Sequence, residues 1–423
     1  MSLKDKRILL GITGSIAAYR ICDLVGLFRK EGAQVRCIVT PSAEKLVSLA
    51  ALEALTGNPV LSDCFGGTPG TIPHIEWIRW AHLYIIAPCT AQSLADLAQG
   101  SGNTLVSLCA LSSQIPVAVA PTMNSAMLHA PATQKNIKQL KEYGYWVLPP
   151  GQGDLACGES GEGKILDTPA LLDYAKIILE LSYLNIYKSY SYGLNKKAIV
   201  TLGHTREPID AVRSLVNTSS GLTGLLIARA LRLFDIQIFL LHGYTDIPLG
   251  NEWGDKALFC PTTEAFADKA QNLLDSIDIL IASAALADFI PQKPESLKIK
   301  NSKLLSNIDL KPSNNILEQY LSSINPQCYS LGFALENPGF ENEALNKWSK
   351  RPTTALLVNT PHSSETYGFG KSLVPSILLH KNSPHQNLPS PLDLNSKVSL
   401  AVQVTQQVRD HLRSTPQNFK ENQ

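Results

Sequence analysis

The chain has 423 residues, of which 44% are hydrophobic and 17% are charged, and its formal net charge is +1 at pH 7. This balance is typical of a soluble globular protein, and it excludes nucleic-acid binding that depends on a strongly basic surface. No run of about 18 apolar residues is present, so we expect no membrane span, and the length suits two domains.

The eight cysteines form no CxxC pair and show no metal-ligand spacing with histidine. Most of them, including Cys22, Cys37 and Cys109, lie in apolar surroundings and are expected to be buried small hydrophobic residues. This usage predicts a reducing, cytoplasmic location, and the N-terminal segment shows no signal-peptide cleavage pattern.

Short apolar runs alternate with helical patterns through the first half of the chain. Strands are expected at 7–13, 34–40, 83–90 and 116–123, and helices at 17–30, 42–56 and 173–184. This alternation is typical of βαβ units around a parallel sheet.

A polar stretch without periodicity marks a linker at 187–195, between a first domain at 1–186 and a second at 196–423. The same pattern then resumes. Strands are expected at 198–203, 236–243, 278–289 and 354–360, with a helix in the region 221–234. The stretch 296–315 is expected to form a loop or β-ribbon, and the tail after Leu412 is expected to fray. The predicted fold is therefore α/β, with two tandem Rossmann-like domains built on mainly parallel sheets.

The turn GITGS, from Gly11 to Ser15, follows the first expected strand and could cradle a phosphate. Gly11 and Gly14 would let backbone N–H groups face a ligand, Thr13 and Ser15 would add hydroxyl donors, and a helix begins beside them. The turn is neither a Walker A loop nor a GxGxxG fingerprint, so by itself it fits a tight strand-to-helix turn equally well. Polar residues at the other strand ends favour a ligand site and suit a mononucleotide such as FMN.

Three further residues stand out. His74 follows a glycine-rich loop, although a lone histidine is more often structural or solvated. Asn124 follows a strand, where an asparagine is more often a helix cap. Cys157 lies between glycines and acidic residues on an expected flexible loop, where thiol reactivity matters more than packing.

The motifs GITGSIAAY, PHIEW, APTMN and ACGESGEGKIL, in this order, resemble the flavin-containing cysteine decarboxylases. TREPIDAVRSLVNTSSG, SAALADF, LKIK and GFALEN resemble phosphopantothenate–cysteine ligase. Together the two halves resemble the bifunctional family of bacterial coenzyme A biosynthesis, to about residue 412. The resemblance implies a flavoprotein-like first domain. It also implies CTP-dependent ligation of cysteine to 4′-phosphopantothenate through an acyl-cytidylate, followed by FMN-dependent decarboxylation to 4′-phosphopantetheine.

The implied decarboxylation needs an electron sink, because the carbon that loses CO₂ bears only an amide nitrogen and CH₂SH. A flavin that accepts a hydride supplies this sink. By resemblance, His74 is the base-like residue, Asn124 binds the substrate carboxylate and Cys157 returns a proton. The resemblance places FMN against Gly11, Thr13, Gly14, Ser15, Thr40, Pro88, Thr90, Asn103 and Met123.

The implied ligation needs positioning and neutralisation of phosphate charge. By resemblance, Asn217 forms or holds the acyl-cytidylate, Lys298 is essential, and Asp288 contacts Mg²⁺ or Mn²⁺. The implied CTP contacts are Ala282, Ser283, Ala284, Asp288, Lys298, Asn314, Asn315, Ile316, Leu317, Phe333, Lys347 and Arg351. For the last basic position, Lys350 remains an alternative to Arg351.

Several positions depart from the family pattern. In the flavin half these are Thr122, Leu128 and Thr104. In the ligase half they are Leu222 for a usual lysine, His204 for Gly or Pro, and Asn314–Asn315 for Pro-Asp. If the missing lysine makes a charged hydrogen bond, its loss would weaken nucleotide binding by about 1–3 kcal/mol, and Lys298 and Lys347 could compensate.

Two alternatives remain open. One is a decarboxylase with a weakened ligase domain. The other is a flavin-binding regulatory module, against which the retention of Asn124 and Cys157 argues. The expected partners are the small-molecule substrates, with no nucleic acid and no membrane. The resemblance also implies a homo-oligomer, with trimeric decarboxylase and dimeric ligase contacts.

Overall fold

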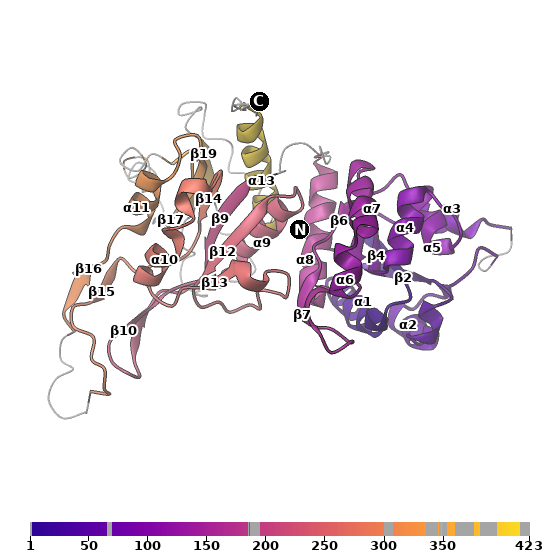
Figure 1. Ribbon diagram of the computed structural model, residues 1–423, viewed down its shortest axis with the longest axis horizontal. Coiled ribbons are helices and arrows are strands. Elements are labelled where there is room, and N and C mark those ends of the chain that lie inside the picture. Colours follow the sequence, from indigo (N-terminus) through magenta and orange to yellow (C-terminus); the bar gives the residue numbers. More distant parts are fainter. Residues whose placement is uncertain are drawn as a thin grey trace. The chain divides into compact units, whose positions relative to one another are not determined.

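The protein is described by a computed structural model that covers residues 2–65, 70–184, 186, 195–299, 308–335, 346, 348, 353–359, 376–380 and 396–414. Contacts divide the chain into two compact units, shown in Figure 1. The first comprises Met1–Ser191 and Leu249–Gly254, and the second comprises Tyr192–Pro248 and Asp255–Gln423. Within the described ranges, no helix is both long and apolar enough to cross a membrane.

The first unit is built on a six-stranded parallel sheet with the strand order β3-β2-β1-β4-β5-β6. Its strands are β1 (Arg7–Ile12), β2 (Gln34–Val39), β3 (Val60–Leu61), β4 (Leu83–Cys89), β5 (Val117–Pro121) and β6 (Trp146–Val147). Every residue of β4 is buried, as expected for a parallel strand covered on both faces. The strand order reverses between β1 and β4, where sheets of this type bind ligands beyond the carboxyl ends.

Helices follow the strands of this sheet as the sequence predicts. They are η1 (Ile16–Arg20), α1 (Ile21–Lys30), η2 (Ala43–Lys45), α2 (Leu49–Thr56), α3 (Pro73–Trp80), α4 (Ala91–Gln99), α5 (Leu105–Leu111), α6 (Ser125–His129), α7 (Pro131–Glu142) and α8 (Thr168–Tyr183). Helix α8 begins earlier than expected, because the proline in its first turn is compatible with a helix start. The expected flexible loop around Cys157 is instead the turn of an antiparallel hairpin formed by β7 (Gly151–Asp154) and β8 (Ser160–Lys164).

The second unit repeats this topology with the strand order β13-β12-β9-β14-β17-β18-β19. Its strands are β9 (Lys197–Leu202), β12 (Gln237–His242), β13 (Ala257–Phe259), β14 (Ile279–Ala282), β17 (Tyr329–Leu335), β18 (Ala355–Asn359) and β19 (Ser376–His380). Only β19 of the described strands in this sheet runs antiparallel to its neighbour. The order reverses between β9 and β14. The two mainly parallel sheets confirm the predicted α/β fold.

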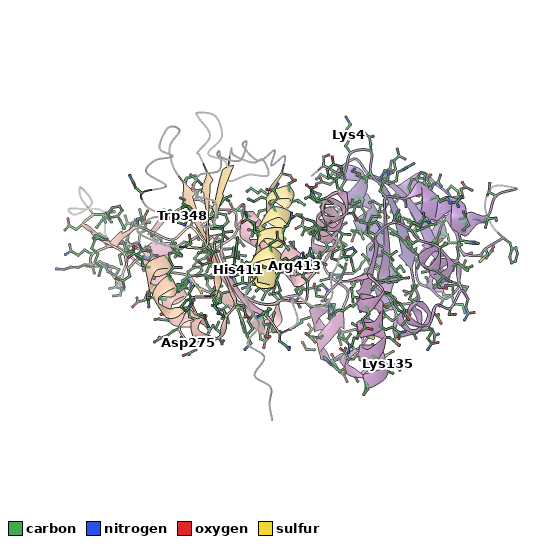
Figure 2. The ribbon with its side chains drawn as sticks, turned by 90° about the horizontal axis from the view of Figure 1, so that it is seen from above. Lys4, Lys135, Asp275, Trp348, His411 and Arg413 are labelled. Atoms are coloured by element: carbon green, nitrogen blue, oxygen red, sulfur yellow. The ribbon has the colours of Figure 1, made fainter. Side chains whose placement is uncertain are left out.

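The helices of the second unit are α9 (Leu222–Arg232), η3 (Gly254–Lys256), α10 (Thr263–Ala270), η4 (Leu274–Ser276), α11 (Ile316–Ser323) and α13 (Lys397–Ser414). Helix α13 carries His411 and Arg413, labelled in Figure 2, and packs on α9. It therefore continues to Ser414, beyond the expected start of fraying.

Two short antiparallel ribbons form an arm of the second unit (Figure 1). They are β10 (Arg206–Pro208) with β11 (Ser214–Val216), and β15 (Phe289–Pro291) with β16 (Leu310–Pro312). Of this ribbon, only β16 lies within the stretch 296–315 where a loop or ribbon was expected, because its partner β15 precedes it. Residues 300–307 lie outside the described ranges.

Candidate functional site

The first unit holds a cavity of about 520 Å³ beyond the carboxyl ends of its strands. It brings together four residues predicted for the flavin site, namely Ser15, Met123, Asn124 and Cys157. The other lining residues are Ile16, Ala17, Tyr19, Arg20, Thr122, Asp154, Leu155, Ala156, Gly163, Lys164 and Ile165. The walls therefore come from η1, the loop after β5 and the β7–β8 hairpin.

The loop that carries Asn124 is fixed to strand β8. The Met123 N–H donates to the Gly163 carbonyl oxygen at 3.0 Å, and the Ser125 hydroxyl donates to the Glu162 carbonyl oxygen at 2.7 Å. Asn124 caps helix α6, since its Oδ1 accepts the Met127 N–H at 2.9 Å. Asn124 is thus the helix cap that its position suggested, and it also lines the cavity.

Cys157 lies at the turn of the hairpin, where it is exposed, and its Sγ is 3.7 Å from Oε2 of Glu159. The other seven cysteines are buried or partly buried. Burial raises the pKa of the Cys109 thiol to about 12 and that of Cys260 to about 11. Cys157 is therefore the thiol that a substrate can reach most readily.

The turn after β1 is tied to the end of β4 by Thr13. Its hydroxyl donates to the Pro88 carbonyl oxygen at 2.8 Å and accepts the Thr90 N–H at 3.0 Å. Because this hydroxyl is already engaged, Thr13 shapes the turn and does not supply the donor expected from the sequence. Gly11 is needed here, since a Cβ at this position would lie 2.6 Å from the Tyr84 hydroxyl.

Polar groups around this turn can receive a phosphate. Ser15 caps η1 by accepting the Ala17 N–H at 3.3 Å, and Thr90 caps α4 by accepting the Ser93 N–H at 3.3 Å. The Thr40 hydroxyl at the end of β2 is buried and has no hydrogen-bond partner within the described part of the chain. Gly14 packs against Ser42, while Asn103 is exposed ahead of α5. Of the predicted residues among these, Ser15 lines the cavity, whereas Gly14, Thr40, Thr90 and Asn103 do not. The unpartnered Thr40 hydroxyl is a donor that a phosphate would satisfy.

His74 lies in the first turn of α3 and is absent from the residues that line the cavity. Its Nδ1 is buried and has no hydrogen-bond partner among the described atoms, and its carbonyl oxygen accepts the Cys109 thiol at 3.7 Å. A single chain thus does not bring His74 into the cavity lined by Asn124 and Cys157.

The second unit holds a cavity of about 280 Å³ at the carboxyl ends of β9, β14 and β17. It brings together most of the predicted nucleotide contacts, namely Ala282, Ala284, Asp288, Asn314, Asn315, Ile316, Leu317 and Phe333. The remaining lining residues are Thr201, Leu286, Ala287, Ser313 and Tyr320. Asn315 caps α11 by accepting the Glu318 N–H at 3.3 Å, so the start of this helix faces the cavity.

Asn217 is held beside this cavity, since its Nδ2 donates to the carbonyl oxygen of Leu286 at 2.7 Å. Ser283 does not line the cavity, and its hydroxyl donates to the Thr201 carbonyl oxygen at 2.6 Å. The Ala284 N–H donates to the Thr201 hydroxyl at 3.1 Å. These two bonds turn the chain out of the sheet, which is why β14 ends well before the expected residue 289.

The turn that follows Asn217 is braced by His204, a residue that departs from the family pattern. The His204 Nδ1 is 2.9 Å from the Ser219 carbonyl oxygen, and its ring stacks on Tyr244 with centroids 6.0 Å apart. Leu222 opens helix α9 directly after Gly221, whose φ is +78°. The turn is therefore shaped by a buried imidazole and a glycine in the left-handed region.

Lys298 is exposed on the extended segment after β15 and does not line the cavity. Lys300, Lys347, Lys350 and Arg351 lie outside the described residues.

Metal ligation has limited support from the chain itself. Among the described residues, no group of three His, Cys, Asp or Glu side chains could hold a metal ion. Asp288 is the carboxylate among the residues lining the second cavity, so a divalent ion there would depend on ligand oxygens for most of its coordination.

Sequence reasoning missed Thr201 and the pair Asp210–Arg213. Thr201 is the penultimate residue of the first strand of its unit, and Thr13 directly follows the first strand of the other unit, so a threonine near this strand end is a signal that could have been used. The pair lies within the TREPIDAVR motif, but its packing against a distant segment could not be read from the sequence.

Two tandem doubly wound α/β units, each with a cavity at the carboxyl ends of its strands, define the class of this protein. The Flavoprotein family matches residues 1–179, and the family described as DNA/pantothenate metabolism flavoprotein C-terminal domain matches residues 194–412. Both matches agree with the resemblance found in the motifs.

Curated relatives cover nearly the whole chain. Coenzyme A biosynthesis bifunctional protein CoaBC of Vibrio vulnificus (strain YJ016) is 30% identical over 96% of this chain and 98% of its own. The protein of the same name from Bacillus subtilis (strain 168) is 31% identical over 96% of this chain and 97% of its own. A solved structure of the FMN-dependent cysteine decarboxylase SpaF is 29% identical, covers 38% of this chain and 91% of its own, and has a TM-score of 0.36. The chain belongs to the family of coenzyme A biosynthesis bifunctional proteins.

Proposed function

We propose that the protein catalyses two consecutive steps of coenzyme A biosynthesis. The second unit ligates cysteine to 4′-phosphopantothenate with CTP through an acyl-cytidylate, and the first unit decarboxylates the product to 4′-phosphopantetheine with FMN. The observation that carries the proposal is that each unit gathers its own set of motif residues at one cavity. Family membership over nearly the full length supports the pairing of the two activities.

The residues of the first unit fit a flavin mononucleotide. Ser15, the first N–H groups of η1 and the Thr40 hydroxyl would hold its phosphate, and Met123 would contact the flavin. When bound, FMN supplies the electron sink that the decarboxylation requires. The volume of the cavity is in the range of small-molecule and cofactor sites.

Asn124 and Cys157 have separate roles in this proposal. The Oδ1 of Asn124 is occupied by the cap of α6, so its amide nitrogen is the group that donates to the substrate carboxylate. Cys157 delivers a proton to the substrate carbon after CO₂ has left, which requires a protonated thiol.

His74 would join the site from a neighbouring subunit of a homo-oligomer. Its buried Nδ1 has no partner in the described part of its own chain, and the resemblance implies trimeric contacts for this domain. Trimeric contacts for the first unit and dimeric contacts for the second belong to this proposal.

In the second unit, the Asn217 side chain and the turn up to Gly221 would hold the acyl phosphate, and Lys298 would neutralise charge that develops during nucleotidyl transfer. Phe333 and the start of α11 would contact the cytidine portion. Asp288 would contribute one ligand to a magnesium or manganese ion, which would supply neutralisation of phosphate charge.

One incubation tests both activities. The purified protein is mixed with 4′-phosphopantothenate, cysteine, CTP and Mg²⁺, and pyrophosphate and CO₂ are followed together. We expect both products, and we expect ATP to release less pyrophosphate than CTP. The protein should also show the visible absorbance of bound flavin.

Two variants assign the reactions to the units. Asn217→Asp should abolish pyrophosphate release and leave CO₂ release from pre-formed 4′-phosphopantothenoylcysteine unchanged. Cys157→Ser should leave pyrophosphate release unchanged and block formation of 4′-phosphopantetheine, with CO₂ release stopping after a single turnover because the thiol acts after CO₂ has left. Release of CO₂ only from the pre-formed substrate by the wild-type protein would indicate a weakened ligase, and release of neither product would indicate a binding module. Equal damage to both reactions by either variant would refute the division of labour.

A further inference from the structure

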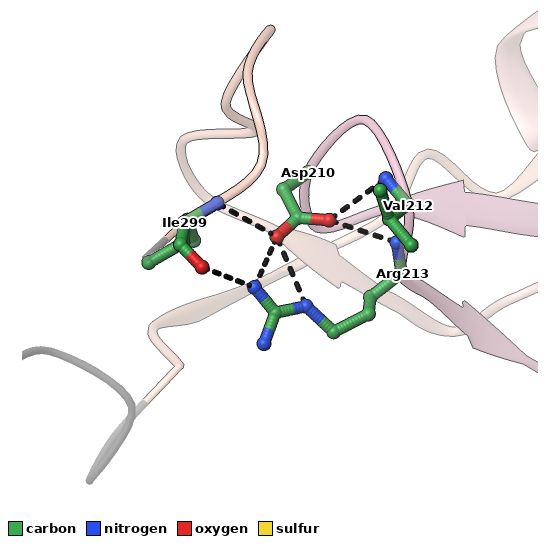
Figure 3. A network of polar contacts seen from close by, with 4 residues as sticks. All are labelled: Asp210, Val212, Arg213 and Ile299. Carbon is green, nitrogen blue, oxygen red and sulfur yellow. Dashed lines mark hydrogen bonds and ion pairs between the residues drawn. The ribbon is translucent and has the colours of Figure 1, made fainter. Parts of the chain in front are cut away.

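The buried carboxylate of Asp210 is the centre of a polar network at the tip of the β10–β11 ribbon (Figure 3). Its Oδ1 accepts the backbone N–H groups of Val212 at 2.9 Å and Arg213 at 2.8 Å. Its Oδ2 accepts the Arg213 Nε–H at 2.9 Å, a second bond from Arg213 Nη2, and the Ile299 N–H at 3.1 Å. Five hydrogen bonds, from Val212, Arg213 and Ile299, thus converge on the Asp210 carboxylate.

This network also holds a segment that is distant in the sequence. Arg213 Nη2 donates to the Ile299 carbonyl oxygen at 3.0 Å, so that both backbone groups of Ile299 are bound. The Glu295 N–H donates to the Ile209 carbonyl oxygen at 3.0 Å. Two anchor points therefore lie on either side of Lys298, whose own side chain is exposed.

The same ribbon leads directly to the proposed acyl-cytidylate site. Strand β11 starts at Ser214, next to Arg213, and ends at Val216, next to Asn217. Asn217 is in turn fixed by its bond to Leu286. The relative placement of Asn217 and Lys298 therefore depends on the hydrogen bonds between the tip of this ribbon and residues 295–299.

The charge of Asp210 is well suited to this task. The hydrogen bond from the Arg213 side chain, assisted by the three backbone N–H groups, holds the pKa of the Asp210 carboxyl well below its usual range. The carboxylate thus stays ionised at any pH at which the protein would work, and its hydrogen bond with the Ile299 N–H persists.

We propose that Asp210, with Arg213, is a positioning residue that fixes the backbone of Lys298 for nucleotidyl transfer. This inference rests on the proposed function of the second unit. Neither residue needs to touch the substrate, because the network acts on the backbone on both sides of Lys298. The Asp210 carboxylate and the Arg213 guanidinium fix the backbone position of Lys298. The exposed Lys298 side chain then reaches the phosphates.

Asp210→Asn is the decisive variant, because it keeps the shape of the side chain but replaces one oxygen by an NH₂ group. At Oδ2, this donor would face the donors of Arg213 and Ile299. We expect kcat for pyrophosphate release to fall on the order of 100-fold, while KM for CTP changes by less than about 3-fold, because an interaction felt mainly in the transition state is lost. Release of CO₂ from the pre-formed substrate should be unchanged.

Asp309→Asn provides a matched control. Asp309 lies on the same arm, is exposed, and offers only its backbone carbonyl oxygen to Gln292 among the described contacts. This variant should ligate like the wild-type protein. A loss of ligation in Asp309→Asn equal to that in Asp210→Asn would show a general effect of charge on the arm and would overturn the proposal.

Hydrogen–deuterium exchange of the full chain measures how firmly the backbone around Lys298 is held, without the need for a reaction. In Asp210→Asn, the amides of residues 297–299 should exchange at least about 10-fold faster than in the wild-type protein, with β9 and β14 unchanged. If residues 297–299 exchanged in Asp210→Asn at the wild-type rate, the proposal would be overturned whatever the activity. Faster exchange combined with a wild-type kcat for pyrophosphate release would also overturn it. If the wild-type protein released no pyrophosphate, or if Lys298→Gln ligated normally, the proposed function would fail, and the exchange would still decide whether Asp210 holds the segment.

Discussion

Gly163 is the position at which a single methyl group should separate the two activities. Its φ of +121° is a conformation that residues with a side chain rarely adopt. A Cβ here would overlap the carbonyl oxygen of Met123 and lie 3.1 Å from the Met123 carbonyl carbon. Both of these atoms belong to the backbone, so strand β8 would have to move by about 1 Å relative to the loop that carries Asn124.

The cost of Gly163→Ala follows from two contributions. The strained φ costs about 1–3 kcal/mol, and the bond from the Met123 N–H to the Gly163 oxygen contributes about 1 kcal/mol if it is lost. We therefore expect the free energy of unfolding of the first unit to fall by about 2–4 kcal/mol. Because a displacement of about 1 Å can reduce a rate by about 100-fold, CO₂ release should fall by about that factor.

Gly144→Ala is the matched control for this experiment. Gly144 has a φ of +87°, and a methyl carbon added to it would meet no atom within 4 Å, so this position carries the conformational strain without the overlap. The substitution should lower stability by about 1 kcal/mol and leave the rate of CO₂ release intact. The assays are CO₂ release from pre-formed 4′-phosphopantothenoylcysteine, pyrophosphate release, and urea unfolding. If Gly163→Ala matched Gly144→Ala in both rate and stability, the argument that β8 positions the Asn124 loop would be refuted.

Three further predictions concern single side chains. His204→Gly removes the brace on Ser219 and should raise KM for CTP about 10-fold without affecting CO₂ release; an unchanged KM would contradict this role. In the native protein, iodoacetamide should modify the exposed Cys157 well before Cys260, because burial raises the pKa of the Cys260 thiol to about 11. Equal labelling of the two cysteines, measured by mass spectrometry, would count against the described burial. Because the pKa of Asp210 is lowered by folding, its contribution to stability is present above the ordinary carboxyl pKa of about 3.9 and is lost as the pH falls below it. The difference in unfolding free energy between wild type and Asp210→Asn should therefore persist from pH 7 to about pH 4 and shrink only below that, and its disappearance by about pH 6 would contradict the assignment.

The central strands could be predicted from the sequence because burial on both faces requires continuous apolar runs, as in β4 and β9. The hairpin β7–β8 could not, because its strands are rich in glycine and have no apolar alternation. Gly153 and Gly163 there adopt positive φ values, which no local pattern specifies. The length of β14 was overestimated for a different reason, since small apolar residues continue past Ala282 while bonds to Thr201 draw the chain away from the sheet.

For the candidate sites, motif matching predicted some of the residues that gather, but His74, Ser283 and Lys298 do not line the cavities. It also did not predict what the polar groups bind. Asn124 and Cys157 line one cavity as expected. The Thr13 and Ser283 hydroxyls instead bond to backbone atoms of neighbouring strands. The contact between Asp210 and Ile299 joins positions 89 residues apart, and only the folded arrangement of the two ribbons brings them together.

In both units, a threonine hydroxyl forms a hydrogen bond across the point where the strand order of the sheet reverses. In the first unit, the Thr13 hydroxyl bonds to the Pro88 carbonyl oxygen and the Thr90 N–H just after β4. In the second, the Thr201 hydroxyl accepts the Ala284 N–H just after β14. In each case a threonine within one residue of the end of the first strand binds the backbone that leaves the neighbouring strand, across the reversal of strand order. Because parallel strands diverge there, this bond fixes the width of the opening in which the ligand would lie. The ligands that we propose for the two units therefore differ through the loops that follow, while the threonine holds the same framework in both.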